Sequence, residues 1–144
     1  MIYEHRVAKI LISKKHSSIS DEDQSGNTPL HLAALNGHWK IIYMLIEEGA
    51  SVDPRNTLQW TPLDCAAAKG FKKCVKVLLE EDAPIDPCDI ARTTPLHLAC
   101  QEGHYEVVRV LLREGADITI CDHMGKNALD MAIEKSHRLV IFIS

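Results

Sequence analysis

One stretch of eleven residues, TPLHLAALNGH at 28–38, decides the fold because it returns at a constant interval. The further copies are TPLDCAAAKGF at 61–71, TPLHLACQEGH at 94–104 and NALDMAIEKSH at 127–137, so each copy begins 33 residues after the one before. A sequence period of roughly 20 to 50 residues is typical of proteins built from stacked structural units. We therefore expect repeated units rather than one large core.

Each copy predicts a pair of short helices. In three copies Thr precedes Pro, which favours a helix start, because the Thr hydroxyl caps free N–H groups and Pro at the first position loses no hydrogen bond. A glycine after the first apolar run favours the end of that helix, since glycine tolerates a positive φ. Apolar residues at three- to four-residue spacing then predict a second helix within residues 41–46, 74–79 and 107–112.

Polar, proline-containing segments separate the helix pairs and predict turns, here called fingers. One finger position is Gly in the outer two copies and is replaced in the middle two, as Gly26, Gln59, Arg92 and Gly125. We expect a different turn in the two middle fingers, because glycine adopts positive φ more readily than other residues.

In the TPLH stretches and their 33-residue step the chain resembles the ankyrin repeat family, over about residues 21–144. The resemblance implies an all-α fold, an ankyrin-repeat solenoid of stacked helix-turn-helix units with β-turn or hairpin fingers and a concave recognition face. It divides the chain into the second helix of a preceding repeat plus a loop at 1–20, ankyrin repeats at 21–53, 54–86 and 87–119, and a partial repeat at 120–144.

The two ends leave two interpretations open. Residues 4–12 align with a second helix that lacks its first helix, and residues 137–144 only begin a second helix. One hypothesis is that the chain is a piece of a longer array. The alternative is a complete small protein whose irregular ends act as caps, because terminal repeats are often atypical.

Composition restricts the partners and the location. The formal net charge is −4, so no basic field of the kind that binds phosphate backbones is present, and nucleic acid is not expected as a partner. No apolar run approaches the roughly 18 residues of a membrane helix, so direct membrane insertion is not expected. We expect a monomer in the cytoplasm, with the nucleus or the cytosolic side of a membrane protein as further possibilities.

Catalysis, a metal site and a cofactor are not expected. None of the common nucleophile, zinc-protease, phosphate-loop or dinucleotide motifs occurs, and most histidines follow the repeat. The resemblance implies that His31 and His97 hydrogen-bond the backbone of a neighbouring loop, with Asp64 and Asp130 as possible acceptors in the same slot. Structural roles are expected as well for the histidines after the helix-ending glycine position, His38, His104 and His137.

Two other groups of side chains keep more than one interpretation. Register predicts burial for Cys65, Cys74 and Cys100, whereas Cys88 and Cys121 share a finger position, and their reactivity stays open. A run of basic residues consists of Lys69, Lys72, Lys73 and Lys76. It either contacts an acidic partner or forms a solvent-exposed helix face.

In the ankyrin family, partners contact the fingers and the exposed side of the first helix. By register the candidate partner-binding residues are Asn27, Thr57, Leu58, Trp60, Ile90, Thr93, His123, Met124 and Lys126 on the fingers, and Leu35, Asn36, Gln101 and Glu102 on the first helices. Trp60 is distinctive because its position is polar in the other copies and Trp is enriched at binding hot spots. It either joins Leu58, Ile90 and Met124 in an exposed apolar patch or folds back over its own finger.

The resemblance implies a non-catalytic scaffold or adaptor that binds one or more proteins, whose identity the sequence does not give. Two alternatives remain. Residues 127–138, NALDMAIEKSHR, resemble last-repeat segments of A-type transient receptor potential channels, which would make the chain the cytosolic ankyrin region of a membrane ion channel. A regulatory or inhibitory subunit of an enzyme would also fit.

Overall fold

The computed structural model describes residues 19–143, and the helix expected within residues 1–20 lies outside that range. The helices are α2 (Pro29–Leu35), α3 (Trp39–Glu47), α4 (Pro62–Lys69), α5 (Lys72–Glu80), α6 (Pro95–Glu102), α7 (Tyr105–Arg113), α8 (Ala128–Glu134) and α9 (Arg138–Ile143). No strand occurs between residues 19 and 143, so the prediction of an all-α ankyrin solenoid is confirmed.

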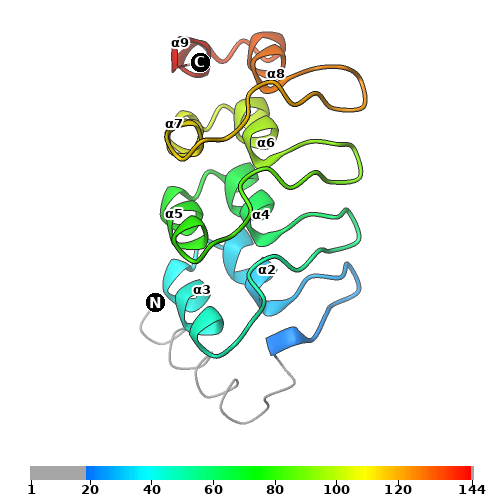
Figure 1. The fold of residues 1–144 in the computed structure, drawn as a ribbon, viewed down its shortest axis with the longest axis vertical. Helices are drawn as coiled ribbons and strands as arrows, with labels where there is room; N and C mark the ends of the chain where they lie inside the picture. Colours follow the sequence, from blue (N-terminus) through cyan, green and yellow to red (C-terminus); the bar gives the residue numbers. More distant parts are fainter. Residues whose placement is uncertain (1–18, 144) are drawn as a thin grey trace.

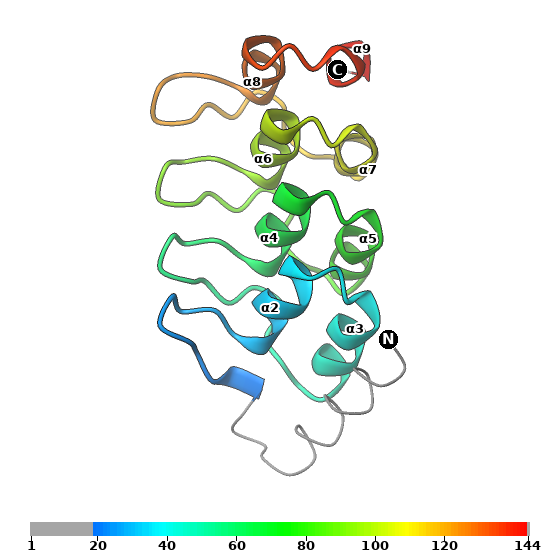
Figure 2. The same ribbon diagram turned by 180° about the vertical axis from the view of Figure 1, so that it is seen from behind.

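The helices form two parallel rows (Figure 1). The inner row consists of α2, α4, α6 and α8, the outer row of α3, α5, α7 and α9, and the fingers project from the side of the inner row (Figures 1 and 2). Each unit therefore packs against its neighbours along one axis, and the core runs the length of the stack.

The inner helices begin where the Thr-Pro pairs predict. The Thr28 hydroxyl accepts a hydrogen bond from the His31 N–H, and the His31 ring accepts one back from the Thr28 N–H, which together form a capping box. The same box occurs at α4 and α6. Asn127 and Asp130 reproduce it at α8 without a proline, so the cap does not depend on Thr-Pro.

Small residues let the inner helices approach closely. Ala34, Ala66, Ala67 and Ala99 have no exposed surface, and Leu30, Leu63 and Leu96 fill the space beside them. Each outer helix buries one apolar stripe against the inner row, such as Val75 and Leu78 of α5. Aliphatic side chains thus supply most of the buried volume, which accounts for the low aromatic content.

The prediction of a different turn in the middle fingers is wrong. Gln59 and Arg92 both have φ of 64°, close to the 75° of Gly26 and the 80° of Gly125. In all four fingers the N–H at this position donates to the carbonyl three residues earlier. The turn is therefore the same, and Gln59 and Arg92 bear the cost of about 1 to 2 kcal/mol that a side chain incurs at positive φ.

The glycines that end the inner helices also make room for the next unit. A Cβ on Gly70 would lie 2.5 Å from Nδ1 of His104, and a Cβ on Gly103 would lie 2.6 Å from Nδ1 of His137. The two histidines are held in place by hydrogen bonds from Nε2 to the carbonyls of Ala68 and Gln101. Their expected structural role is thus a contact between units.

Candidate functional site

The finger tips form one continuous edge because backbone hydrogen bonds join each finger to the next. The Thr57 N–H donates to the Ser25 carbonyl at 3.0 Å, and the Ile90 N–H donates to the Leu58 carbonyl at 3.1 Å. The His123 N–H donates to the Ala91 carbonyl in the same way. Side chains at the tips are consequently held at fixed positions relative to one another.

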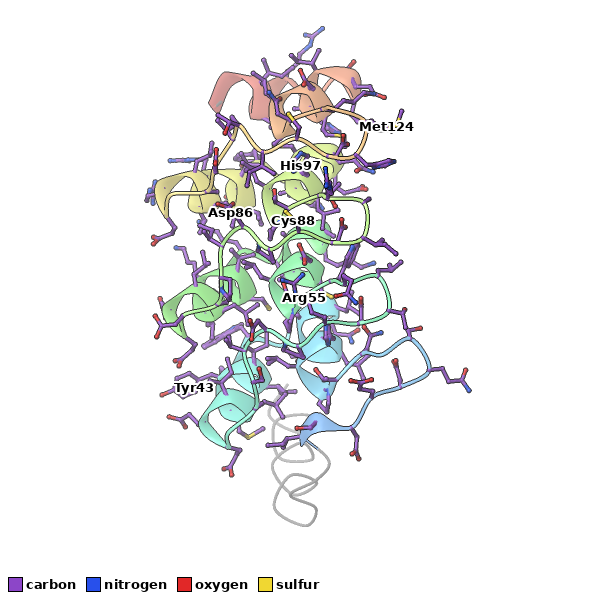
Figure 3. All side chains as sticks on the ribbon, turned by 45° about the vertical axis from the view of Figure 1, so that its right-hand side comes forward. Tyr43, Arg55, Asp86, Cys88, His97 and Met124 are labelled. Carbon is purple, nitrogen blue, oxygen red and sulfur yellow. The ribbon has the colours of Figure 1, made fainter. Side chains whose placement is uncertain are left out.

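Apolar side chains project from this edge. Leu58 is 50%, Ile90 71% and Met124 67% exposed. Leu58 and Ile90 are neighbours through the backbone bond just described, and Met124 lies on the following finger, at the rim of the molecule (Figure 3). We call Leu58, Ile90 and Met124 the finger-tip ridge.

The register position of Ile90 explains why its side chain points outward. At the same position Thr57 donates its hydroxyl to the Ser25 carbonyl at 3.0 Å, and Nδ1 of His123 lies 3.1 Å from the Ala91 carbonyl oxygen. Those two polar side chains therefore turn towards the preceding finger. Ile90 has no polar atom to do so.

Trp60 connects three units instead of joining the ridge. Its indole N–H donates to Oδ2 of Asp89 in the next finger at 2.9 Å, and its carbonyl accepts from Nε2 of His31 in the preceding unit at 2.7 Å. The ring is half-buried against the core. Trp60 is thus placed between two fingers, and neither position considered from the sequence describes it.

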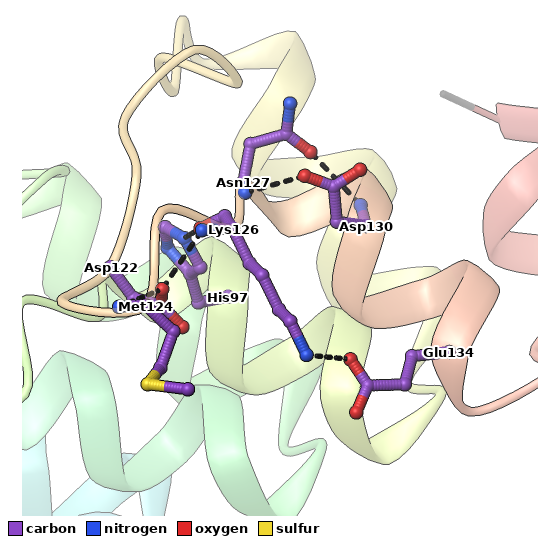
Figure 4. A network of polar contacts seen from close by, with 7 residues as sticks. All are labelled: His97, Asp122, Met124, Lys126, Asn127, Asp130 and Glu134. Carbon is purple, nitrogen blue, oxygen red and sulfur yellow. Dashed lines mark hydrogen bonds and ion pairs between the residues drawn. The ribbon is translucent and has the colours of Figure 1, made fainter.

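The residues at the position of Trp60 in the other fingers also contact other residues of this chain. Asn27 accepts a hydrogen bond from the Asn56 side chain, and Thr93 is buried, with its hydroxyl donating to Asp89. Lys126 forms an ion pair with Glu134 of α8 (Figure 4). These three predicted site residues hold fingers in place, and Thr93 offers almost no surface to a partner.

The predicted residues on the inner helices lie apart from the ridge. Leu35 and Asn36 lie at the carboxyl end of α2, and Gln101 and Glu102 at that of α6, whereas each finger precedes the amino end of its helix. Eight residues of helix span about 12 Å. The candidate residues therefore divide into a finger-tip group and a helix-end group.

The histidines in the TPLH slot lock neighbouring units together, as predicted. Nδ1 of His31 accepts from the Thr28 N–H, so the proton of the neutral ring is on Nε2, which donates to the Trp60 carbonyl. Nε2 of His97 makes the same contact with the Lys126 carbonyl at 3.0 Å (Figure 4). Burial lowers the pKa of His31 and so favours this neutral form.

Asp64 occupies the same slot without making the contact between units. Its Oδ2 accepts from the N–H and the hydroxyl of Thr61, while Oδ1 is buried without a hydrogen-bond partner. The expectation that Asp64 would bond the neighbouring finger as an acceptor is wrong, because the group offered there in the other units is a carbonyl, itself an acceptor. Burial raises the pKa of Asp64 to about 7.

Asp130 differs from Asp64 in exposure. It is exposed, and its Oδ2 accepts from the Asn127 N–H within the capping box (Figure 4). The carboxylate therefore keeps contact with solvent, which Asp64 lacks.

The cysteines follow the sequence prediction in their exposure. Cys65, Cys74 and Cys100 are buried, whereas Cys88 and Cys121 are exposed. Burial raises the pKa of Cys65 and Cys100 to about 12 and that of Cys74 to about 11. The buried thiols are thus packing groups, because a reactive cysteine needs an accessible thiolate.

One repeated finger position was missed in the sequence interpretation. Oδ1 of Asp23, Asn56, Asp89 and Asp122 accepts hydrogen bonds from the N–H groups two and four residues later in every finger. These bonds close the turn and stabilise the positive φ of Gln59 and Arg92. An Asp or Asn every 33 residues is visible in the sequence and would have predicted four equal turns.

Two kinds of feature do not occur within residues 19–143. That range holds no group of three or more His, Cys, Asp or Glu side chains that could bind a metal ion. It also holds no helix with the length and apolarity needed to span a membrane.

Comparison with known proteins agrees with the fold. A family model described as ankyrin repeats, in three copies, matches residues 2–91, and a single ankyrin repeat matches residues 92–123. Inversin of Danio rerio is 41% identical over 54 residues, which are 37% of this chain and 5% of that protein. Alpha-latrotoxin-Lt1a of Latrodectus tredecimguttatus is 40% identical over 50 residues, 35% of this chain and 4% of the toxin.

The chain thus spans only a small part of the length of either relative. The family matches, by contrast, extend over most of the chain, from residue 2 to residue 123. The helix pairs, the capping boxes and the finger turns follow the same 33-residue register. The chain belongs to the ankyrin repeat family.

Proposed function

We propose that this chain is a non-catalytic scaffold that binds a protein partner through the finger-tip ridge. The observation that carries the proposal is the exposure of Leu58, Ile90 and Met124 on three consecutive fingers. Exposed apolar side chains that cluster on one edge are typical of protein-binding surfaces.

The hydrogen bonds between fingers make this ridge a favourable binding surface. Each tip is fixed by a backbone bond to a neighbouring finger and by an Asp or Asn that closes its turn. A surface that is ordered before binding loses little conformational entropy when the partner docks. The apolar area buried on binding therefore contributes to affinity with little offset.

The buried titratable groups support a non-catalytic role. His31 acts in a contact between units, Asp64 caps a helix, and Cys65 and Cys100 pack in the core. Perturbed pKa values often mark catalytic sites. In this chain the causes of the perturbation are the burial and the packing of stacked repeats.

The combined variant Leu58→Ser, Ile90→Ser, Met124→Ser should lose at least about tenfold in partner affinity, because hot-spot truncations commonly cost about 2 kcal/mol. Its melting temperature should stay within about 3 °C of the parent protein, since the three side chains are exposed. Binding is measured by quantitative mass spectrometry of the proteins retained from an extract of the source cells.

Two further variants serve as controls. Tyr43→Ser combined with Tyr105→Ser removes exposed aromatic surface from the outer helices and should leave the retained proteins unchanged. Trp60→Ala should instead lower the free energy of unfolding by about 2 to 3 kcal/mol, since it removes packing and a hydrogen bond between fingers. Undiminished retention by the triple variant would overturn the proposal.

A further inference from the structure

The outward side of α5 and α7 carries charge opposite in sign to that of the whole chain. The chain has a formal net charge of −4, yet within α5 and α7 the cations outnumber the anions. The cations there are Lys72, Lys73, Lys76, Arg109 and Arg113, and the anions are Glu80 and Glu106. This segregation makes a local positive potential on an otherwise acidic molecule.

The cations line a groove between the two helices. One cavity of about 270 Å³ is lined by Lys76, Leu79, Glu80, Val110, Arg113 and Glu114. A second cavity of about 100 Å³ is lined by Lys72, Glu106, Arg109, Val110 and Arg113. Because Val110 and Arg113 belong to both, the cavities are parts of one feature, which we call the α5–α7 groove.

The groove combines an apolar floor with charged walls. Val110 is buried and Leu79 half-buried, and both belong to the packed core of the stack. Lys72 and Lys76 are one turn apart on α5, and Arg109 and Arg113 are one turn apart on α7. Four cationic side chains and three carboxylates thus surround a small apolar surface, and the formal charge of the groove is +1, four cations less three anions.

These four cations form no ion pair with any other residue that the structure describes. Across residues 19–143 the one ion pair joins Lys126 to Glu134, far from the groove in the chain. Glu80, Glu106 and Glu114 line the same groove without forming an ion pair with its cations. Lys72, Lys76, Arg109 and Arg113 therefore keep their charges available to an incoming anion.

The order of charges along α5 costs stability. Lys72 lies in its first turn and Glu80 at its end, opposite to the order that the helix dipole favours, whereas Lys73 in the same turn lies over the ring of Trp39. In α7 the order is favourable, with Glu106 in the first turn and Arg113 in the last. A charge order that opposes the helix dipole lowers the stability of the helix, and such local departures are expected where the residues serve a function.

We propose that the α5–α7 groove binds an acidic segment of a second protein partner. An apolar side chain of the segment contacts Leu79 and Val110, and carboxylates on either side of it pair with Lys76 and Arg109. The recessed floor and the glutamates at the rim favour separate carboxylates over the flat, uniformly anionic surface of a lipid bilayer. The helices that line the groove, α5 and α7, belong to the outer row, on the side away from the fingers (Figure 2), so the groove does not depend on the finger-tip ridge.

Fluorescence anisotropy of a labelled pentapeptide, with leucine between two pairs of glutamates, tests this proposal on the full chain. We expect saturable binding that is lost at about 1 M salt, where the Debye length is about 3 Å. Lys76→Glu combined with Arg109→Glu should weaken binding at least about tenfold, because like charges then face each other. The matched control, Lys135→Glu with Arg138→Glu, makes the same change of charge elsewhere and should bind as the parent does.

A charge-reversed peptide shows whether the groove variant is folded. With lysines in place of its glutamates, the peptide should bind Lys76→Glu/Arg109→Glu and not the parent protein. Equal weakening by the control pair, or binding of the parent to a peptide with glutamines in place of the glutamates, would overturn the proposal. So would sedimentation of the parent with phosphatidylserine vesicles in the absence of peptide binding, since the groove would then serve a membrane.

Discussion

Asp64→Asn should raise the free energy of unfolding by about 2 to 4 kcal/mol at pH 8, because it removes a charge that the folded protein buries. The asparagine oxygen can keep the hydrogen bonds that Oδ2 of Asp64 accepts from Thr61, and its amide group replaces the partnerless Oδ1. An amide can donate to a carbonyl, as the histidines of the neighbouring units do. Urea-induced unfolding measures the difference.

The gain from Asp64→Asn should depend on pH in one direction. Burial raises the pKa of Asp64 from 3.8 to about 7 on folding, so the folded state binds the proton more tightly than the unfolded state. The stability that the protonated Asp64 carboxyl contributes is complete below pH about 4 and is lost as the pH rises through about 7. The gain should therefore be smaller at pH 5 than at pH 8, by about 2 kcal/mol.

Asp130→Asn is the matched control, because Asp130 has the same position in its own capping box and is exposed. It should change the free energy of unfolding by less than about 0.5 kcal/mol at either pH. A gain from Asp64→Asn that is equal at pH 5 and pH 8, or a loss at pH 8, would contradict the assignment of a buried, destabilising carboxylate.

Gly70→Ala should lower the free energy of unfolding by about 3 kcal/mol. The backbone of Gly70 has φ of 79°, which costs alanine about 1 to 2 kcal/mol. The new methyl group would also lie 2.5 Å from Nδ1 of His104, a ring that its bond to the Ala68 carbonyl holds in place. Chemical denaturation measures the loss.

Gly125→Ala separates the two costs. Gly125 has φ of 80°, yet nothing lies within 4 Å of the place that its new methyl group would take, so this variant should lose only about 1 kcal/mol. The difference of about 2 kcal/mol reports the contact between units. His104→Ala combined with Gly70→Ala should cost less than the sum of the single changes, and equal losses for Gly70→Ala and Gly125→Ala would show that the contact is absent.

Features that depend on one unit could be predicted from the sequence. The Thr-Pro starts, the glycine ends and the apolar stripes set the helix positions through local hydrogen bonding and periodicity. The turns of Gln59 and Arg92 were predicted wrongly because the prediction depended on the missing glycine alone. The preceding Asn56 and Asp89, which close those turns, carried the signal.

Features that depend on contacts between units could be predicted only in part. The position of Asp64 in the repeat was predicted correctly. Whether its carboxylate has a hydrogen-bond donor depends on the group that the next finger places there, which in the other units is a carbonyl 29 residues later in the chain. The direction of the Trp60 indole likewise depends on Asp89 in the following finger. Register also selected Thr93 as a site residue, whereas packing buries it.

Site-specific photo-crosslinking tests most directly whether the finger-tip ridge is the partner-binding surface. p-Benzoylphenylalanine is placed at Ile90 on the ridge or, as control, at Glu48, an exposed residue after α3 on the outer row. The proposed function predicts that, in an extract of the source cells, the proteins cross-linked from position 90 are not cross-linked from position 48. Equal yields of the same proteins from the two positions, or a higher yield of them from position 48, would contradict it.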